Sequence, residues 1–240
     1  MMPDPAAVHA AVAATWPAAA VTRVGPWIIR EGRGGGSRVS AATQAGPVSA
    51  ADVPLAEAAM RALGQRPLFM LREEDGALDA VLAAAGYGVL DPVVGYAAPV
   101  SAIATQRPPP ITTFEVWPPL AVQAEIWGEA GIGPARLAVM DRTAQPKTTL
   151  LGRVDDRPAG TAFVACHEGI AMLHALEVAP ALRRRGLAGH MLRAAAFWAQ
   201  AQGADWLALV VTRANAGANA LYASLGMTVV GQYHYRILPE

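Results

Sequence analysis

Two hydrophobic patterns stand out in the second half of the chain. Residues 206–211 form a near-continuous apolar run, which is typical of a strand covered on both faces. Residues 187–201 repeat apolar side chains at helical spacing, and Gly203 follows as a stop. The apolar stripe of this segment consists of Leu187, Met191, Ala194 and Trp198. These patterns predict a helix whose apolar face lies on a sheet, followed by a buried strand.

The rest of the second half predicts more elements of both kinds. Strands are expected at 111–116, 148–154, 160–166 and 170–178, and helices at about 120–130 and 134–142. A helix at Asn215 and a last strand closed by residues 233–236 complete the series. Three adjacent strands followed by strand, helix, strand, helix and strand predict an α/β fold (an α+β mixed sheet) with helices on both faces.

The first half shows a similar alternation. Its pattern predicts helices at 5–20, 53–63 and 78–85, and strands at 26–30, 38–42, 68–72 and from Tyr87 onward. The glycine-rich segment 31–37 is interpreted as a flexible hairpin tip, because no helix start follows it. Asp52 is the expected N-cap of the second of these helices.

The order of elements recurs at an offset of 140 positions. This offset aligns Gly86 with Gly226, and it aligns Asp75, Asp79 and Leu82 with Asn215, Asn219 and Tyr222. The prolines of residues 105–110 favour an extended linker between the two halves. We therefore expect a domain at 1–104, a linker at 105–110 and a domain at 111–240.

Composition and charge exclude several classes of protein. Of the 240 residues, 53% are hydrophobic and 16% are charged, which argues against disorder. A formal net charge of zero gives no global attraction to nucleic acid or an anionic membrane. The N-terminal stretch lacks the basic region of a signal peptide, and the chain has no apolar run of membrane-spanning length. A cytoplasmic protein is the expectation, with Cys166 as a buried thiol.

The segment 183–189, Arg-Arg-Arg-Gly-Leu-Ala-Gly, carries the strongest chemical signal. It connects the strand at 170–178 to the helix at 187–201. A helix N-terminus is already electropositive, so arginines there are favourable only if an anion lies among them. Gly186, Ala188 and Gly189 are small enough to let a polyanion reach backbone amides. The segment is predicted to be a diphosphate-binding loop, called the phosphate loop below.

Residues 183–188 match the pattern Arg/Gln-x-x-Gly-x-Gly/Ala, preceded by Val178 and Pro180 and followed by Asn215-x-x-x-Asn219-x-x-Tyr222-x-x-x-Gly226. In this context the chain resembles the GNAT superfamily of acyl-CoA N-acyltransferases over roughly residues 111–240. The resemblance implies that acetyl-CoA is the co-substrate, with the strand before the loop pairing with its pantetheine arm. It implies cofactor contacts by Leu176, Val178, Arg183, Arg184, Arg185, Gly186, Leu187, Ala188, Gly189, Asn215, Asn219 and Tyr222.

The resemblance also gives an interpretation of the first half. Residues 43–51, between its hairpin and its helix, contain no basic residue and no phosphate-loop pattern. Residues 1 to about 100 are therefore interpreted as a degenerate GNAT-like copy in a tandem, which shapes the substrate cleft or packs as a pseudo-dimer partner. An unrelated small α+β domain is the alternative.

Acyl transfer requires a proton for the departing thiolate and a base for the amine. The resemblance implies that Tyr222 lies near the thioester sulfur, which makes it the candidate acid. Glu177 is the candidate base, although a surface glutamate is an equal alternative. Strand alternation places Glu177 on the face opposite Leu176 and Val178 and also opposite His174. Asn215 and Asn219 have capping or cofactor roles, and residues 233–236 line the acceptor site or form a half-exposed strand.

The sequence thus predicts an N-acetyltransferase that acts on a primary amine, in a small molecule or a peptide, by direct attack on acetyl-CoA. The alternative is a non-catalytic CoA-binding or interaction module. Val210 occupies the position at which ribosomal-protein alanine acetyltransferases have a glutamate, so their specificity is not carried over. The five histidines show no metal-ligand spacing, so no metal site is expected. Neither nucleic acid nor membrane is an expected partner, and the protein is a monomer or a homodimer.

Overall fold

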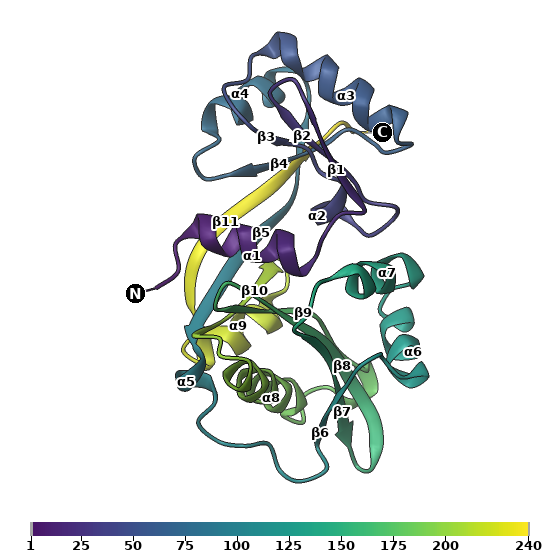
Figure 1. Ribbon diagram of the computed structural model, residues 1–240, viewed down its shortest axis with the longest axis vertical. Helices are drawn as coiled ribbons and strands as arrows, with labels where there is room; N and C mark the ends of the chain where they lie inside the picture. Colours follow the sequence, from purple (N-terminus) through teal and green to yellow (C-terminus); the bar gives the residue numbers. More distant parts are fainter. Residues whose placement is uncertain (1, 240) are drawn as a thin grey trace.

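The strands assemble into one long mixed sheet and one small sheet. The computed structural model describes residues 2–239, and within them the long sheet has eight strands in the order β4-β11-β5-β10-β9-β8-β7-β6 (Figure 1). Their bounds are β4 Leu68–Arg72, β5 Gly88–Pro99, β6 Thr113–Val116, β7 Lys147–Val154, β8 Arg157–His167, β9 Ile170–Val178, β10 Trp206–Thr212 and β11 Thr228–Ile237. The small sheet contains β1 Ala20–Val24, β2 Trp27–Glu31 and β3 Thr43–Gln44. The predicted mixed α/β fold is confirmed.

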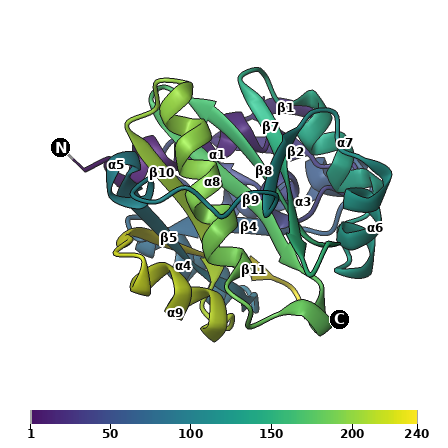
Figure 2. The ribbon, with the colours of Figure 1, turned by 90° about the horizontal axis from the view of Figure 1, so that it is seen from below.

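Helices cover both faces of the long sheet. Their bounds are α1 Pro5–Thr15, α2 Ser37–Ser40, α3 Val53–Ala62, α4 Gly76–Ala84, α5 Val100–Ile103, α6 Ala121–Glu129, α7 Pro134–Arg142, α8 Leu187–Ala201 and α9 Ala216–Ser224. Short 3-10 turns at Ala50–Asp52 and Pro180–Leu182 precede α3 and the phosphate loop. Figure 2 shows α8 crossing the near face of the sheet, with α1 on the far side.

Alternation along β8 explains how the two faces are filled. Ala162 and Val164 point to one face and pack in the same buried cluster as the apolar stripe of α8. Phe163 and Ala165 point to the other face, where they pack with Trp16 and with apolar residues of α6 and α7. The first turn of α8 also lies very close to the sheet, because Gly160 leaves room for it. A Cβ atom there would be 2.8 Å from the Glu177 carbonyl oxygen and 3.1 Å from Met191 Sδ.

The two halves of the chain exchange strands. β5 follows α4 in the first half, yet it lies between β10 and β11 of the second half. β11 in turn lies between β5 and β4, so each half contributes its last strand to the other's side of the sheet. The predicted linker at 105–110 is irregular, as expected from its prolines, but the sheet continues across the two halves on either side of it.

The exchanged strands pair with an approximate twofold relation. The units β4-α4-β5 and β10-α9-β11 have helices that begin 140 positions apart, at Gly76 and Ala216. At the centre, Val93 pairs with Tyr233, which is also 140 positions away. The outer pairs follow the same rule. Thr212 pairs with Val93 in one, Arg72 pairs with Tyr233 in the other, and the corresponding residues of the two pairs are 140 positions apart.

Side chains from the two helices attach the exchanged strands at equivalent positions. Asp79 on α4 accepts hydrogen bonds from Arg236 of β11, at 2.8 Å from Nε and 3.0 Å from Nη2. Asn219 on α9 accepts one from the hydroxyl of Tyr96 on β5, at 3.1 Å. Each helix therefore holds the strand that comes from the other half of the chain.

Several predicted elements of the first half were wrong. Residues 38–42 are not a strand: residues 37–40 form α2, which buries Val39, and the hairpin partner of β2 is β1. The helix predicted to reach residue 20 ends at Thr15. Asp52 does not cap α3, because its carboxylate accepts hydrogen bonds from the backbone and hydroxyl of Ser49 instead.

The space between β2 and β4 in the first half is closed by the chain itself. β3 pairs with β2, and Ala42 forms a parallel bridge with Phe69 of β4. Gln44 Nε2 donates to Asp75 Oδ1 at 2.5 Å. Residues 42–44 thus fill the space between β2 and β4. The equivalent space in the second half, between β9 and β10, is left open beyond Leu173 and Leu209.

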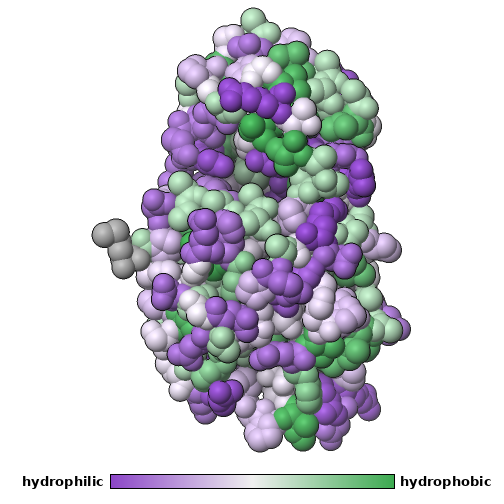
Figure 3. Space-filling model, in the orientation of Figure 1, coloured by the Kyte–Doolittle hydropathy of each residue, from purple (hydrophilic) through white to green (hydrophobic). Residues whose placement is uncertain are grey.

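The surface shows mixed character. On the face drawn in Figure 3, hydrophilic and hydrophobic side chains are interspersed along the whole length of the molecule. Within residues 2–239, no helix has the length and hydropathy needed to cross a membrane.

Candidate active site

A gap opens between β9 and β10 in the middle of the long sheet. The two strands pair in parallel from Ile170 and Trp206 to Leu173 and Leu209, and no further pairs follow within the described residues. β9 nevertheless stays paired with β8 as far as Val178. The opposite edge of β9, at residues 174–178, therefore has no strand partner, although the carbonyls of Ala175 and Val178 accept hydrogen bonds from Trp127 Nε1 and Arg183 Nε.

The phosphate loop presents unpaired amides beside this gap. No described residue accepts a hydrogen bond from the backbone N–H groups of residues 184–189, while the amides of Arg183 and His190 are bonded to Pro180 and Gly186. Arg184 and Gly186 have positive φ angles of 64° and 81°. Successive amides in such a conformation form a concave anion site at a helix N-terminus. The loop therefore fits a diphosphate.

The three arginines of the loop are not equivalent. Arg183 Nε donates to the Val178 carbonyl at 2.9 Å, and its Nη2 lies 4.0 Å from Glu177 Oε2. Arg185 forms an ion pair with Asp155. Arg184 has no hydrogen bond or ion pair with any residue in the described range. Arg184 is thus the loop cation that remains available to a ligand.

Tyr222 lies on α9 at the other side of the gap. Its side chain is 7% exposed and packs in the same cluster as Leu187, with its ring 5.7 Å from that of Tyr96. Burial, together with the negative charge of Glu177, raises the pKa of Tyr222 to about 12. Its hydroxyl forms no hydrogen bond with any residue in the range 2–239, so the phenol proton is retained and uncommitted at neutral pH.

Both candidate asparagines have structural contacts. Asn215 caps α9 by accepting a hydrogen bond from the Ala218 amide at 3.1 Å. Asn219 Nδ2 donates to the carbonyls of Thr212 and Asn215, at 3.1 and 2.7 Å, while its Oδ1 accepts from Tyr96. These bonds join the end of β10 to α9. They account for both asparagines by capping and positioning.

A bulge in β9 corrects the predicted side-chain directions. Ala175 has a φ of 49°, and the register shifts so that His174 pairs with Phe163 while Glu177 pairs with Thr161. Because the partners Phe163 and Thr161 share one face, His174 and Glu177 share it too. Simple alternation had placed them on opposite faces, and that prediction was wrong.

Glu177 is half-buried, and its charge is poorly solvated. Burial raises the pKa of Glu177, although the positive charges of Arg183 and Arg136 act to lower it. A carboxylate with a raised pKa is a stronger base than an exposed glutamate. The negative charge of Glu177 also contributes to the raised pKa of Tyr222.

His174 is held by a chain of hydrogen bonds from the first half. Arg38 Nη1 donates to His174 Nδ1 at 3.0 Å, so Nε2 carries the proton and lies 2.8 Å from Thr15 Oγ1. That hydroxyl donates to the Ala11 carbonyl at 2.6 Å. Burial, with a smaller contribution from Arg38, lowers the pKa of His174 well below its usual value. These are the contacts of a neutral, positioning histidine.

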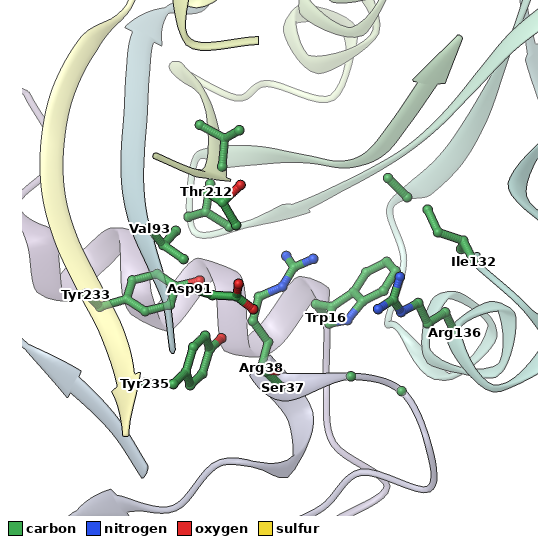
Figure 4. A pocket seen from close by; sticks show the side chains of 15 residues that line it. Trp16, Ser37, Arg38, Asp91, Val93, Ile132, Arg136, Thr212, Tyr233 and Tyr235 are labelled. Carbon is green, nitrogen blue, oxygen red and sulfur yellow. The ribbon is translucent and has the colours of Figure 1, made fainter. Parts of the chain in front are cut away.

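A cavity of about 220 Å³ lies against the bulge (Figure 4). Ala175 of β9 and residues 210–212 of β10 form its wall on the side of the gap. The rest comes from distant parts of the chain: Trp16, residues 35–38, Asp91, Val93, Ile132, Arg136, Tyr233 and Tyr235. The first half thus contributes directly to the space beside the candidate active site.

Sequence reasoning missed most of these cavity residues. Tyr233 and Tyr235 were expected to line an acceptor site or to form a half-exposed strand, and both are buried and line the cavity. Trp16, Arg38 and Arg136 carried no motif, because only the folded chain brings them together. Cys166 is partly buried, and burial raises the pKa of its thiol to about 11. Across the described part of the chain, no group of three or more acidic, histidine or cysteine side chains could hold a metal.

The second half of the chain is similar to a known protein family. The model of the acetyltransferase (GNAT) family matches residues 111–227, the segment from β6 to α9 that contains the phosphate loop. A comparison with curated proteins gave no match.

Solved structures share the fold over three quarters or more of the chain. A GCN5-related N-acetyltransferase from Kribbella flavida has 20% identity and a TM-score of 0.71, over 100% of this chain and 97% of its own. A conserved protein of unknown function from Staphylococcus epidermidis has 12% identity and a TM-score of 0.68, over 90% and 92%. A tandem GNAT protein from the clavulanic acid biosynthesis pathway has 14% identity and a TM-score of 0.58, over 75% and 66%.

Proposed function

Since residues 111–227 match the acetyltransferase (GNAT) family, we propose that the protein is an N-acetyltransferase that transfers an acetyl group from acetyl-CoA to a primary amine by direct attack. One observation carries the proposal: unpaired amides at residues 184–189 lie beside the gap between β9 and β10, with an uncommitted phenol at Tyr222. Phosphate binding, an open strand edge and a proton donor are thereby available at one place.

Each part of the co-substrate has a proposed binding position. The amides of Arg184 to Gly189 hold the diphosphate, and Arg184 adds the unpaired charge. The free edge of β9 at Leu176 and Val178 pairs with the pantetheine arm. Arg183 and Arg185 act indirectly, because their existing bonds to Val178 and Asp155 hold the loop in shape. Asn215 and Asn219 position α9 and, through it, Tyr222.

The chemistry requires one base and one acid. The amine nitrogen attacks the thioester carbonyl carbon, a C–N bond forms and the C–S bond breaks. Glu177, whose raised pKa suits a base, takes the proton released by the amine. Tyr222 donates its phenol proton or a hydrogen bond to the departing thiolate. The attack is favoured because the acceptor and the thioester are held close together at the gap. No covalent enzyme intermediate is formed.

We propose that residues 1–104 are a degenerate copy of the domain formed by residues 111–240. The pairing offset of 140 positions around Val93 and Tyr233 supports a duplicated unit. Residues 42–44 fill the gap that would otherwise accept a cofactor in the first half. The proposed role of the first half is to build the acceptor side of the cleft, because residues 35–38 line the cavity.

A thiol-release assay with acetyl-CoA against a panel of amines, amino acids and peptides tests the proposal. Turnover with at least one amine is expected. Hydrogen exchange gives a second measurement: acetyl-CoA should protect residues 176–190 and α9 but leave residues 43–51 unchanged. Protection without turnover for any amine would instead indicate a non-catalytic CoA-binding module. The absence of both would refute the assignment.

A further inference from the structure

Two arginines face the cavity without an acidic partner. Arg136 of α7 is half-buried and forms no hydrogen bond or ion pair with any residue in the range 2–239. Arg38 contacts only neutral groups, the imidazole of His174 at 3.0 Å and the Trp16 ring, whose centroid is 5.0 Å from Cζ. In the view of Figure 4, the two guanidinium groups lie on opposite sides of the Trp16 indole.

Two partly buried arginines elsewhere in the chain have their charges or donors satisfied. Arg236 is paired with Asp79, and Arg30 donates to the Ala41 carbonyl and the Thr43 hydroxyl. Acidic residues are as numerous as basic ones, at 19 each, so the unmatched charge of the cavity is local. Half-buried cations without partners lose hydration, and an anionic ligand restores the lost interactions.

The cavity contains one carboxylate of its own, which does not neutralise the pair. Asp91 lines the cavity but lies beyond the 4.0 Å of an ion pair with either arginine. His174 is neutral and its Nδ1 already accepts the hydrogen bond from Arg38. The groups that face the cavity therefore leave a net positive charge.

The position of this charge relates it to the proposed chemistry. Ala175 at the bulge and residues 210–212 form the cavity wall, on the same face of β9 as Glu177. Arg136 is close enough for its charge to act on Glu177. Glu177 itself is not one of the residues that line the cavity, so the cavity adjoins the proposed base at the bulge rather than containing it. The volume of about 220 Å³ is smaller than the 300–1,000 Å³ typical of drug-sized ligands.

We infer that the acceptor is a small amine that also carries a carboxylate, an amino acid in chemical class, with the carboxylate held by Arg38 and Arg136. This inference rests on the proposed acetyltransferase function and names its substrate class. Guanidinium groups bind carboxylates through charge-assisted hydrogen bonds, which discriminate strongly against an uncharged analogue. The first half of the chain, through Arg38, then takes part in selecting the substrate.

The test uses the twenty standard amino acids and their α-carboxamides as acceptors for the full-length protein. For the accepted side chain, kcat/KM should be about tenfold or more higher for the carboxylate than for the amide, as expected for a charge-assisted bond. Arg136→Gln should remove this preference by raising KM for the carboxylate while leaving the amide unchanged. Arg142→Gln is the matched control, because Arg142 is on the same helix and bonds only its own helix carbonyl at Ala138.

Two outcomes overturn the inference. In the first, wild-type protein turns over the amides as well as the amino acids; in the second, Arg136→Gln lowers both rates equally. If no amine is turned over, calorimetry with the same panel in the presence of CoA gives the answer. Carboxylate binding that Arg136→Gln abolishes and Arg142→Gln preserves would support the inference while the proposed function fails. Equal binding of acids and amides, or none, would refute it.

Discussion

Removal of one oxygen atom, in Tyr222→Phe, tests the proposed mechanism most directly. The ring of Tyr222 is buried and packs 5.7 Å from the Tyr96 ring, and phenylalanine keeps that contact. The hydroxyl has no hydrogen-bond partner within residues 2–239, so its removal leaves no buried group unsatisfied. Stability should therefore change by less than about 0.5 kcal/mol, the usual limit for a substitution without a structural cost.

Turnover should respond very differently from stability. The phenol, with a pKa of about 12, is fully protonated at neutral pH and can donate to a thiolate. Loss of a positioned acid lowers kcat by about a hundredfold, the low end for general acid catalysis. That factor corresponds to about 2.7 kcal/mol of transition-state stabilisation. CoA affinity should stay within about twofold, because phosphate binding is assigned to the amides of residues 184–189.

The measurements are kcat, CoA affinity by calorimetry and Tm, all on the same Phe variant. A normal kcat together with a lowered Tm would identify Tyr222 as a packing residue and refute the assignment. A lowered kcat with lost CoA affinity would assign the hydroxyl to binding instead. Tyr87→Phe, in the core of the first half, is a control for removal of a phenol, because that hydroxyl donates to Glu57 of α3 and does not lie at the gap.

Three further predictions concern the loop, the sheet and the junction of the halves. Gly186→Val should lower CoA affinity by more than about tenfold with an unchanged circular dichroism spectrum, because a β-branched residue is strained at φ 81°; unchanged affinity would contradict the loop assignment. Gly160→Ala should destabilise the fold by about 1–3 kcal/mol in urea unfolding, through overpacking against Met191. Gly217→Ala, where a Cβ meets open space, should not destabilise it. The Asp79 carboxyl has its pKa lowered to about 2, first by the hydrogen bonds from Arg236 and then by His234. A carboxyl whose pKa is lower in the folded state stabilises the fold at pH values above its unfolded pKa, which for Asp is about 3.8. Asp79→Asn should therefore lower the free energy of unfolding by about 1 kcal/mol at pH 7, and by progressively less as the pH falls from about 4 to 2. A difference in stability between variant and wild type that does not change with pH would show that the ion pair contributes nothing.

The sequence predicted the elements of the second half well, because strong periodicity and capping residues define them locally. The helix at 187–201 has the expected bounds, and the strand at 170–178 was also predicted correctly. The first half was harder. Arg38 to Ala42 has the composition of a short strand, but Gly36 with a φ of 96° turns the chain, and α2 forms instead to bury Val39.

The site was predicted in its motif and missed in its tertiary parts. Phosphate-loop residues are contiguous, so their spacing is visible in the sequence. The bulge at Ala175 is invisible to simple alternation, and it reverses the direction expected for Glu177 relative to His174. Arg38 and Arg136 are far apart in the chain and have no mutual spacing that a pattern could reveal. Only the exchange of strands and the packing of α1 bring them to one cavity.

The exchanged strands also constrain the order in which the chain can become structured during synthesis. β4 needs β11 as its neighbour, although about 155 residues separate them in the sequence. As the ribosome releases the first half, β5 is available but the strand that joins it to β4 has not yet been translated. Until then one edge of β4 and both edges of β5 stay open; β10 closes one edge of β5, and β11 closes the other two edges when it emerges. Such long-range closure predicts slow folding, and it makes a transient chaperone-bound state of the nascent first half an expected stage of its biogenesis.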